Sequence, residues 1–370
     1  MSESQRTIVL ASGGTGGHIF PAEALAVELK NRGDNVILLT DKRYKNYAGE
    51  LNKLESHVIS TSTIGGGIFN KMKGAVDVMA GFMQAYGLLN KIKPDVVVGF
   101  GGYPSFPTMM AALKQGRKTI IHEQNSMLGK ANYVLARKVD VIATSFKEVS
   151  GIEDRDMDRV ILTGNPVRQT IKTLRDMQYP ELREDGILRI LVTGGSQGAS
   201  IFSTVVPEAI KMLPSDFRKR IRVDQQCRPN DLAIAKEIYD EIGVSADLAT
   251  FFNDMPSRLA SAHIVIARSG ASTLAELTVA GRPVIMVPFP HAKDDHQSVN
   301  ANALEDVGGG WVIPEGAFTP ASLSSRLENF LNLPETLKEA AENAKKAGMP
   351  DADRNLADLV DKVYNASSVR

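Results

Sequence analysis

The chain has 370 residues, 43% of them hydrophobic, and its 43 Lys and Arg residues balance its 43 Asp and Glu residues. This length and apolar content predict about two domains with ordinary cores. The zero net charge argues against a dedicated nucleic-acid-binding protein, and the one cysteine, Cys227, excludes an internal disulfide and favours a reducing cytoplasm. No apolar run is long enough to span a membrane, and the run before the first glycines is too short for a signal peptide.

Short and nearly continuous apolar runs alternate with helical patterns along the first half of the chain. Such runs are typical of strands buried on both faces, so they predict a doubly wound parallel sheet. Ligands of such sheets bind at the carboxyl ends of the strands. The expected strands are residues 7–12, 35–40, 95–100, 118–122 and 140–143.

A glycine-rich loop, Gly13-Gly14-Thr15-Gly16-Gly17, lies between the first expected strand and a helix that begins near Pro21. Glycine lets a ligand approach the backbone closely, and the first turn of a helix offers unpaired N–H groups, so the loop predicts a phosphate site. Its spacing fits neither the P-loop motif nor G-x-G-x-x-G, which disfavours kinase and nucleoside triphosphatase chemistry. His18 follows the loop and suits a general base, the alternative being a histidine with local hydrogen bonds only.

A polar region from residue 169 to 186 separates this first series of elements from a similar second series. We therefore expect an α/β fold with two Rossmann-like doubly wound parallel-sheet domains, residues 1–165 and 166–349, that face each other across a cleft. The second series contains strand 188–193, the glycine turn 194–198, a helix over 199–213 and later strands at 264–267, 283–288 and 310–313.

The end of the sequence predicts helices. Thr319-Pro320 combines a preferred N-cap residue with a preferred first helical residue. Two further helices are expected at about 334–347 and 353–364, and the last of them could pack on either domain, including the N-terminal one.

Polar residues follow several expected strands and are candidate ligand contacts. The four polar side chains of His122-Glu123-Gln124-Asn125 favour substrate contacts over a core. Arg268-Ser269-Gly270-Ala271-Ser272-Thr273 ends another strand and offers donors to a phosphate. For Glu276 the spacing leaves two possibilities open: it completes a capping box with Thr273, or it accepts hydrogen bonds from ribose hydroxyls.

One acidic motif could indicate a metal site. Asp154-Arg155-Asp156 lies in a charged stretch without strands, so a solvated loop is favoured. No cluster of His, Cys and carboxylate residues has the spacing of transition-metal ligands.

An apolar stripe with helical spacing, flanked by lysines, predicts either a core-facing helix or a surface that touches anionic lipid. The stripe consists of Ile68, Phe69, Met72, Val76, Met79, Phe82, Met83 and Tyr86.

Seven motifs together resemble the bacterial N-acetylglucosaminyltransferases of peptidoglycan synthesis, the MurG family. They are GGTGGHIFP at 13–21, KPDVV at 93–97, GGY at 101–103, HEQN at 122–125, GNPVR at 164–168, GGSQG at 194–198 and RSGA at 268–271. The resemblance implies the GT-B fold. It also implies inverting, metal-independent transfer of GlcNAc from UDP-GlcNAc to the C4 hydroxyl of MurNAc in undecaprenyl-pyrophosphoryl-MurNAc-pentapeptide.

The resemblance implies roles for individual residues and no cofactor. His18 would be the general base, with Glu123 as the next candidate. The partners would be UDP-GlcNAc, the lipid-linked acceptor and the anionic cytoplasmic side of the inner membrane, where the protein would be peripheral. Cys227 and His296 depart from the family pattern, which has glycine and glutamine there. Substrate contacts would come from Thr15, Gly16, Gly17, Asn125, Arg168, Ser196, Phe252, Ala271, Ser272, Thr273, Glu276 and Gln297.

Three other functions stay open at this point. They are another GT-B transferase with a diacylglycerol or polyketide acceptor, a UDP-GlcNAc 2-epimerase, and a non-catalytic sensor of a nucleotide sugar. An epimerase needs acid and base carboxylates and no lipid-facing surface, whereas a sensor would bind UDP-GlcNAc without releasing UDP.

Overall fold

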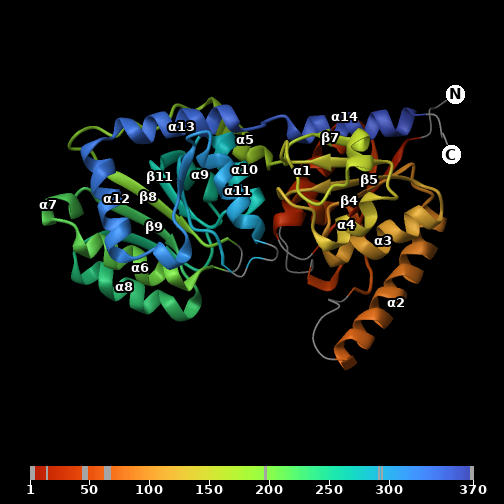
Figure 1. Cartoon of the computed structure of the whole chain (residues 1–370), viewed down its shortest axis with the longest axis horizontal. Coiled ribbons are helices and arrows are strands. Elements are labelled where there is room, and N and C mark those ends of the chain that lie inside the picture. The colour runs from red at the N-terminus through yellow and green to blue at the C-terminus, as the bar shows by residue number, and fades with distance from the viewer. Residues whose placement is uncertain are drawn as a thin grey trace. The chain divides into compact units, whose positions relative to one another are not determined.

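The computed structural model describes residues 5–13, 16–43, 49–61, 68–195, 198–290, 292 and 295–366. The chain divides into two compact units, one made of Met1–Arg168 with Asp351–Arg370 and the other of Gln169–Pro350 (Figure 1). Both units are α/β, with helices between successive parallel strands.

Over the described residues, the first unit holds a seven-stranded parallel sheet in the order β3-β2-β1-β4-β5-β6-β7. The strands are β1 (Thr7–Ala11), β2 (Asn35–Thr40), β3 (Glu55–Val58), β4 (Val96–Gly99), β5 (Lys118–Glu123), β6 (Val141–Thr144) and β7 (Val160–Leu162). The helices are α1 (Gly16–Asn31), α2 (Ile68–Ile92), α3 (Gly102–Lys114), α4 (Lys130–Ala136) and α14 (Ala352–Asn365).

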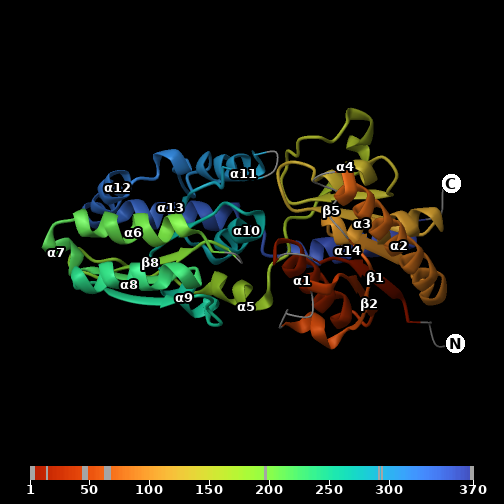
Figure 2. The ribbon, with the colours of Figure 1, turned by 90° about the horizontal axis from the view of Figure 1, so that it is seen from below.

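Side chains alternate along β1 and divide between two cores. Ile8 and Leu10 belong to a core formed with α1 and α14, whereas Val9 belongs to a core formed with α2, α3 and α4. Figures 1 and 2 show these helices around the sheet. The sheet is therefore covered on both faces, which explains the continuous apolar runs Ile8–Ala11 and Val96–Val98 in its central strands.

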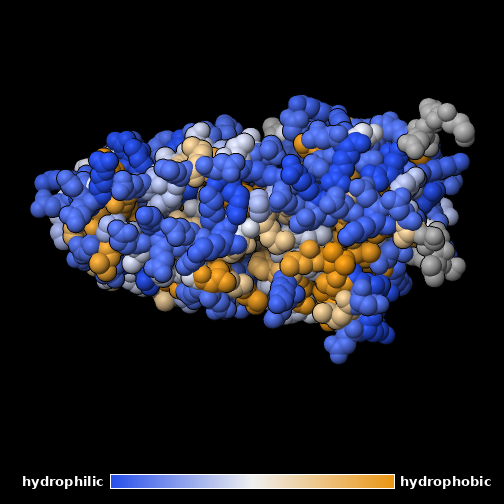
Figure 3. All heavy atoms as spheres, turned by 90° about the horizontal axis from the view of Figure 1, so that it is seen from above, coloured by the Kyte–Doolittle hydropathy of each residue, from blue (hydrophilic) through white to orange (hydrophobic). Residues whose placement is uncertain are grey.

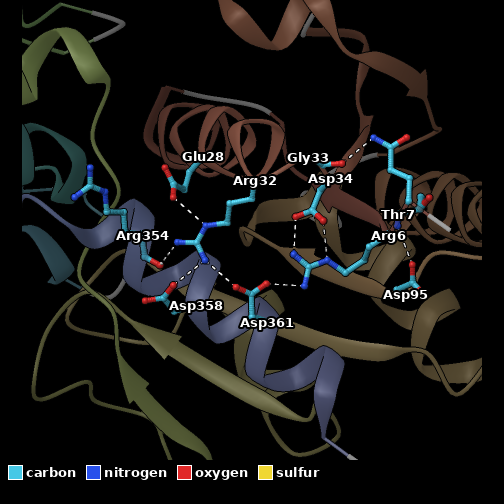
Figure 4. A network of polar contacts seen from close by, with 11 residues as sticks. Arg6, Thr7, Glu28, Arg32, Gly33, Asp34, Asp95, Arg354, Asp358 and Asp361 are labelled. Carbon is cyan, nitrogen blue, oxygen red and sulfur yellow. Dashed lines mark hydrogen bonds and ion pairs between the residues drawn. The ribbon is translucent and has the colours of Figure 1, made fainter. Parts of the chain in front are cut away.

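The helix α14 belongs to the first unit, a question that the sequence left open. Its apolar face joins the core beside α1 through residues such as Leu356 and Val360. Ion pairs fix the same helix at the surface, where Arg32, just after α1, binds Asp358 at 2.7 Å and Asp361 at 2.8 Å (Figure 4).

The second unit, in its described part, holds a six-stranded parallel sheet in the order β10-β9-β8-β11-β12-β13. The strands are β8 (Leu188–Thr193), β9 (Ile221–Gln226), β10 (Ser245–Ala249), β11 (Ile264–Ala267), β12 (Val284–Met286) and β13 (Gly310–Val312). The helices are α5 (Gln169–Lys172), α6 (Ser200–Met212), α7 (Ser215–Arg218), α8 (Leu232–Glu241), α9 (Met255–Ser261), α10 (Ala271–Ala280), α11 (His296–Glu305), α12 (Pro320–Asn332) and α13 (Glu335–Ala347).

The two sheets share one topological feature. β1 lies between β2 and β4, and β8 lies between β9 and β11, so the strand order reverses at the same place in each unit. Ligands of doubly wound sheets bind at this reversal, at the carboxyl ends of the strands. Each unit therefore has one preferred binding edge, next to the loop that follows its first strand.

The predicted start of α12 is confirmed. The Thr319 hydroxyl accepts a hydrogen bond from the Ser322 backbone N–H at 3.2 Å, and the Ser322 hydroxyl accepts one from the Thr319 N–H at 3.1 Å. Pro320 is the first helical residue. This reciprocal capping satisfies donors that the first turn of a helix leaves unpaired.

Two local expectations were wrong. The first helix begins at Gly16, ahead of Pro21, which lies inside the helix. Proline keeps a helical φ and costs this helix one backbone donor.

The Asp154–Arg159 segment is a 3-10 helix, and Asp156 is buried in an ion pair with Arg159, so the prediction of a fully solvated loop is wrong there. Among the described residues, no group of three or more His, Cys, Asp or Glu side chains could hold a metal ion.

The surface is mostly hydrophilic on the face drawn in Figure 3, where apolar residues gather in small patches. Within the described part of the chain, no helix is long and apolar enough to cross a membrane.

Candidate active site

The carboxyl ends of β1, β4 and β5 lie side by side in the first sheet. β1 leads into α1, β4 leads into α3, and β5 leads into Gln124 and Asn125. Because these strands are parallel neighbours, the residues that follow them meet at one edge although they are far apart in the sequence. This edge brings together His18, Gly102 and Gln124.

His18 lies in the first turn of α1 and is partly buried. Its Nδ1 is 2.8 Å from Oε1 of Gln124, a contact that spans 106 positions in the sequence. The Ser12 hydroxyl donates to the His18 backbone carbonyl at 2.8 Å. A Cβ added to Gly102 would lie 3.2 Å from Nε2, so this edge of the ring faces the Gly102 turn. The alternative of a histidine with local hydrogen bonds only is wrong.

Gln124 and His122 are buried behind His18. Nε2 of Gln124 is 2.9 Å from both Nδ1 and the carbonyl oxygen of His122, and Nε2 of His122 is 2.9 Å from the carbonyl oxygen of Gly164. Burial lowers the pKa of His122 to about 4, a shift that the bond to Gly164 opposes and the neighbouring His18 reinforces. His122 is therefore neutral at pH 7.

The Glu123 carboxylate is 2% exposed and accepts four hydrogen bonds. Oε1 accepts from the backbone N and Nδ2 of Asn125 at 3.1 and 3.2 Å. Oε2 accepts from Gly129 N at 3.0 Å and from Asn132 Nδ2 at 2.9 Å. These bonds fold the segment after β5 around the carboxylate and orient Asn125. The geometry makes Glu123 a support for this segment.

The expectation that the whole HEQN motif contacts substrate needs correction. His122, Glu123 and Gln124 are buried, and their polar atoms bond inside the unit. Asn125 is the one side chain of the four that is partly exposed. It remains a candidate contact.

Arg168 lies against the beginning of α1. Its guanidinium is 4.4 Å from the centre of the Phe20 ring, and a Cβ on Gly16 would come within 2.9 Å of the same ring. Gly16 and Gly17 form the first turn of α1, which also carries His18, and Arg168 lies next to it through Phe20. Two further predicted contacts, Thr15 and Ser196, lie outside the described residues.

In the second unit, Ala271, Ser272 and Thr273 form the first turn of α10, at the carboxyl end of β11. The N-cap is Gly270, and no side chain caps the helix. The capping box of Thr273 with Glu276 is therefore wrong, because Glu276 lies in the second turn. Ser272 and Glu276 are four positions apart, partly exposed and on one face of the helix.

Gln297 is held beside this turn by Ser269. The buried Ser269 hydroxyl donates to the Gln297 backbone carbonyl at 2.8 Å, and Asn300 Nδ2 donates to the Ser269 carbonyl at 3.2 Å. The side-chain oxygen of Gln297 accepts from Phe289 N at 3.0 Å. The beginnings of α10 and α11 are thus linked.

Phe252, the predicted uracil contact, is 5% exposed, and the Arg258 guanidinium lies 3.8 Å from its ring centre. The adjacent Phe251 is 62% exposed. One face of the Phe252 ring is therefore occupied within the unit. Arg258 is itself bound by three carboxylates, those of Asp224, Asp247 and Asp254.

The helix α2 lies at the lower side of the first unit in Figure 1. It presents an apolar stripe to solvent. Val76, Met79 and Met83 are 67%, 62% and 61% exposed, and Tyr86 is 37% exposed. Phe82 of the stripe packs against the core together with residues such as Leu89, so a core-facing stripe is confirmed for Phe82 and wrong for those four. Three other stripe side chains lie outside the described ones: Ile68, Phe69 and Met72.

Comparison with known proteins matches both units. The glycosyltransferase family 28 N-terminal domain matches residues 8–144, and the family 28 C-terminal domain matches residues 189–356. Relatives from Rhodospirillum centenum and Paramagnetospirillum magneticum are each 50% identical over 357 and 361 residues. The alignments cover 96% and 97% of this chain and 94% and 97% of the relatives. Both relatives are named UDP-N-acetylglucosamine--N-acetylmuramyl-(pentapeptide) pyrophosphoryl-undecaprenol N-acetylglucosamine transferase.

Solved structures share the fold. Acinetobacter baumannii MurG has a TM-score of 0.76 and 27% identity, covering 96% of this chain and 99% of that chain. A UDP-GlcNAc 2-epimerase from Neisseria meningitidis has a TM-score of 0.65 at 14% identity, covering 96% of this chain and 100% of that chain. At that identity the likeness to the epimerase shows the fold alone.

Two Rossmann-like sheets, each with a glycine turn after its first strand, together with these matches define a glycosyltransferase. The chain belongs to glycosyltransferase family 28, the family of the N-acetylglucosamine transferases named above.

Sequence reasoning missed three residues at these edges. Gln124 and His122 were grouped with ligand contacts, although they bond to each other and to His18. Arg228 lies over the second glycine turn, with its guanidinium 3.2 Å from the Ser200 hydroxyl and 3.2 Å from the Gly198 carbonyl. Its place directly after β9 was the available signal, because residues after central strands collect at the binding edge.

Proposed function

We propose that this chain transfers GlcNAc from UDP-GlcNAc to the C4 hydroxyl of MurNAc in undecaprenyl-pyrophosphoryl-MurNAc-pentapeptide. The names of the curated relatives supply the substrates. The position of His18, with Nδ1 on Gln124 and Nε2 toward the Gly102 turn, is the observation that supports the chemistry. The donor sugar is α-linked and the product is β-linked, so one displacement with inversion suffices.

His18 acts as the general base in this proposal. Its Nε2 takes the proton of the C4 hydroxyl while that oxygen attacks C1 of GlcNAc. The bond from C1 to the diphosphate breaks, and the electron pair leaves on UDP. Backbone N–H groups at helix N-termini and the Arg168 guanidinium stabilise this charge, so the leaving group needs no metal ion.

The donor is assigned mainly to the second unit. The first turn of α10 supplies phosphate donors, Glu276 supplies a carboxylate for the ribose hydroxyls, and Gln297 supplies an amide for GlcNAc. The uracil would lie near Phe252. The remaining proposed contacts to the diphosphate and sugar are Thr15, Gly16, Gly17, Asn125, Arg168, Ser196, Ala271, Ser272 and Thr273.

Release of UDP from UDP-GlcNAc, measured with and without the lipid-linked MurNAc-pentapeptide, tests the reaction. We expect release that depends on the acceptor. Conversion of the donor to its 2-epimer would identify the epimerase alternative, and binding without release of UDP would identify a sensor. Either result would overturn the proposal.

The His18→Ala variant tests the base. We expect kcat to fall by about 10²- to 10⁴-fold, the usual contribution of a general base, while the Kd for UDP-GlcNAc stays within about twofold. His57→Ala is the control, because His57 pairs with Glu55 on the edge strand β3. A wild-type kcat in His18→Ala would remove His18 as the base.

We also propose that α2 attaches the protein peripherally to the anionic cytoplasmic side of the inner membrane, where the acceptor is anchored. The stripe of Val76, Met79, Met83 and Tyr86 offers apolar surface, and Lys91 and Lys93 are exposed at the end of the helix. Apolar burial at the headgroup boundary and attraction of lysine to anionic lipid act together in such attachment.

Sedimentation with vesicles of phosphatidylglycerol and phosphatidylcholine tests this attachment. We expect Met83→Gln to weaken vesicle binding by about tenfold, because one buried apolar side chain contributes roughly 1.5 to 3 kcal/mol. Met212→Gln is the matched control, since Met212 is 57% exposed at the end of α6. Equal binding by the two variants would rule out α2 as the attachment surface.

A further inference from the structure

We propose that Gln124 and His122 are positioning residues that hold the proton of His18 on Nδ1 and thereby keep Nε2 unprotonated. The inference rests on the proposed function, in which Nε2 takes the proton of the acceptor hydroxyl. Its basis is an unbroken chain of hydrogen bonds within the first unit, from the Gly164 carbonyl through His122 and Gln124 to His18.

The chain begins at a group with a fixed role. A backbone carbonyl only accepts, so Nε2 of His122 must carry a hydrogen to bond to the Gly164 oxygen at 2.9 Å. His122 is fully buried and neutral. Its Nδ1 therefore has no hydrogen and accepts one from Nε2 of Gln124, 2.9 Å away. The Gly164 carbonyl thus sets the tautomer of His122.

The same surroundings fix the orientation of the Gln124 amide. Its second amide hydrogen donates to the His122 carbonyl oxygen at 2.9 Å. A flipped amide would place Oε1 against that carbonyl oxygen and against the lone pair of His122 Nδ1, leaving buried acceptors unpaired. Oε1 of Gln124 must therefore point toward His18.

The last link determines the state of His18. Oε1 of Gln124 cannot donate, so Nδ1 of His18, 2.8 Å away, carries the hydrogen. The lone pair of the neutral ring then lies on Nε2, the atom that faces the Gly102 turn. Neutral histidine in water favours the opposite tautomer, with the hydrogen on Nε2. The buried chain selects the tautomer that can act as a base.

The tautomer of His18 is measurable by NMR of the full chain labelled with ¹⁵N-histidine, with His18→Ala used to assign the signals. We expect a protonated Nδ1 and an unprotonated Nε2 for neutral His18 in the wild type. In Gln124→Met, which keeps the side-chain length and removes the acceptor, we expect the hydrogen on Nε2. We also expect kcat to fall by about tenfold while KM for UDP-GlcNAc is unchanged, because a wrong tautomer impairs proton transfer and not donor binding.

Two further variants separate positioning from a loss of packing. In Gln124→Glu, one carboxyl oxygen is again an acceptor opposite Nδ1 of His18, and the other, when protonated, donates to His122, so we expect the Nδ1 tautomer and part of kcat to return. Gln225→Met makes the same change at another buried glutamine, whose amide donates to the Phe202 carbonyl at 3.1 Å and accepts from Tyr239 at 2.7 Å. We expect Gln225→Met to lower stability without changing the His18 signals or kcat.

The NMR result does not depend on turnover, so two failures can be told apart. The same His18 tautomer in the wild type and Gln124→Met would overturn the positioning role, as would a hydrogen on Nε2 in the wild type. A wild-type kcat in His18→Ala would instead overturn the base in the proposed function, and with it the value of this tautomer for the reaction.

Discussion

Arg32, which directly follows α1, and Asp361 of α14 form an ion pair of 2.8 Å that joins segments from opposite ends of the sequence. Asp361 also binds Arg6 at 2.6 Å, and Arg6 binds Asp34 at 2.7 Å (Figure 4). Asp361 is thus shared by two guanidinium groups, one just after α1 and one just before β1. Its carboxylate links the last helix of the unit to the first strand and the first helix.

The Asp361→Asn variant should lower the free energy of unfolding of the first unit by about 1 kcal/mol, since each partly exposed ion pair contributes up to about that much. Added salt should shrink the difference. Asp351→Asn is the control, because its 3.4 Å pair with Arg354 is more than half exposed. Urea unfolding at low and at high salt measures the free energy of unfolding of both variants. Equal losses in the two variants would contradict a special role for Asp361.

The Gly102→Ala variant should lower kcat. Gly102 has a φ of +72°, and a Cβ there would lie 3.2 Å from Nε2 of His18. Gly116→Ala is a matched control, because Gly116 has a φ of +64° with nothing within 4 Å of an added Cβ. Both should lose about 1 to 2 kcal/mol of stability from the left-handed backbone. We expect kcat to fall in Gly102→Ala and not in Gly116→Ala. The same kcat in both variants would contradict the idea that the added Cβ crowds His18.

Stability should fall as the pH drops from 6.5 toward 4. Burial lowers the pKa of His122 and of His263 from 6.5 to about 4 in the folded protein. Between these values the unfolded chain binds protons that the folded protein does not, so acid favours unfolding. Above pH 6.5 both residues are neutral in both states, and their contribution is complete. For His122 the loss by pH 4 is of order 3 kcal/mol.

The free energy of unfolding, measured from pH 8 to pH 4, tests whether these buried histidines cause a loss of stability in acid. His122→Phe should flatten the acid limb of the first unit, because phenylalanine binds no proton. It retains an aromatic ring near Phe100, whose centre is 5.6 Å from that of His122. If the unfolding free energy of His122→Phe depended on pH as steeply as that of the wild type, other groups would cause the loss of stability in acid.

The Glu276→Gln variant should weaken binding of UDP by about tenfold, because hydrogen bonds to a charged acceptor contribute about 1.5 to 3 kcal/mol. Binding of GlcNAc 1-phosphate, which has no such ribose, should not change. Glu339→Gln on the exposed face of α13 is the control. Isothermal titration calorimetry measures the Kd of both ligands. An equal loss of affinity for UDP and for GlcNAc 1-phosphate would indicate that Glu276 stabilises α10 and does not bind the ribose.

Most of the buried strands were predictable from the sequence, whereas the buried strand β9 and several outer strands were not. β2 and β8 have the bounds that their apolar runs predict, 35–40 and 188–193. β3 and β10 were missed because they lie at sheet edges and consist largely of polar or exposed residues. An edge strand is defined by its backbone hydrogen bonds to one neighbour. Side-chain hydrophobicity alone does not report that pairing.

Only part of the candidate site could be predicted in the same way. His18 could be predicted as a site residue because it directly follows a glycine loop in the sequence. The role of Gln124 could not be predicted, because its bond to His18 spans 106 positions and the direction of its amide depends on His122. Polar side chains at the end of β5 resemble ligand contacts in the sequence. Their burial, which depends on how α1, α3 and α4 pack, makes them structural partners instead.

The packing of α14 gives the chain an order of assembly. The second unit, Gln169–Pro350, is one continuous segment, whereas the first sheet needs Ala352–Asn365 to cover the face that contains Ile8 and Val96. During translation, every strand of that sheet leaves the ribosome before α14, which covers this face together with α1. The nascent protein must therefore shield a partly open apolar sheet face from aggregation, through chaperones or provisional packing, until α14 emerges.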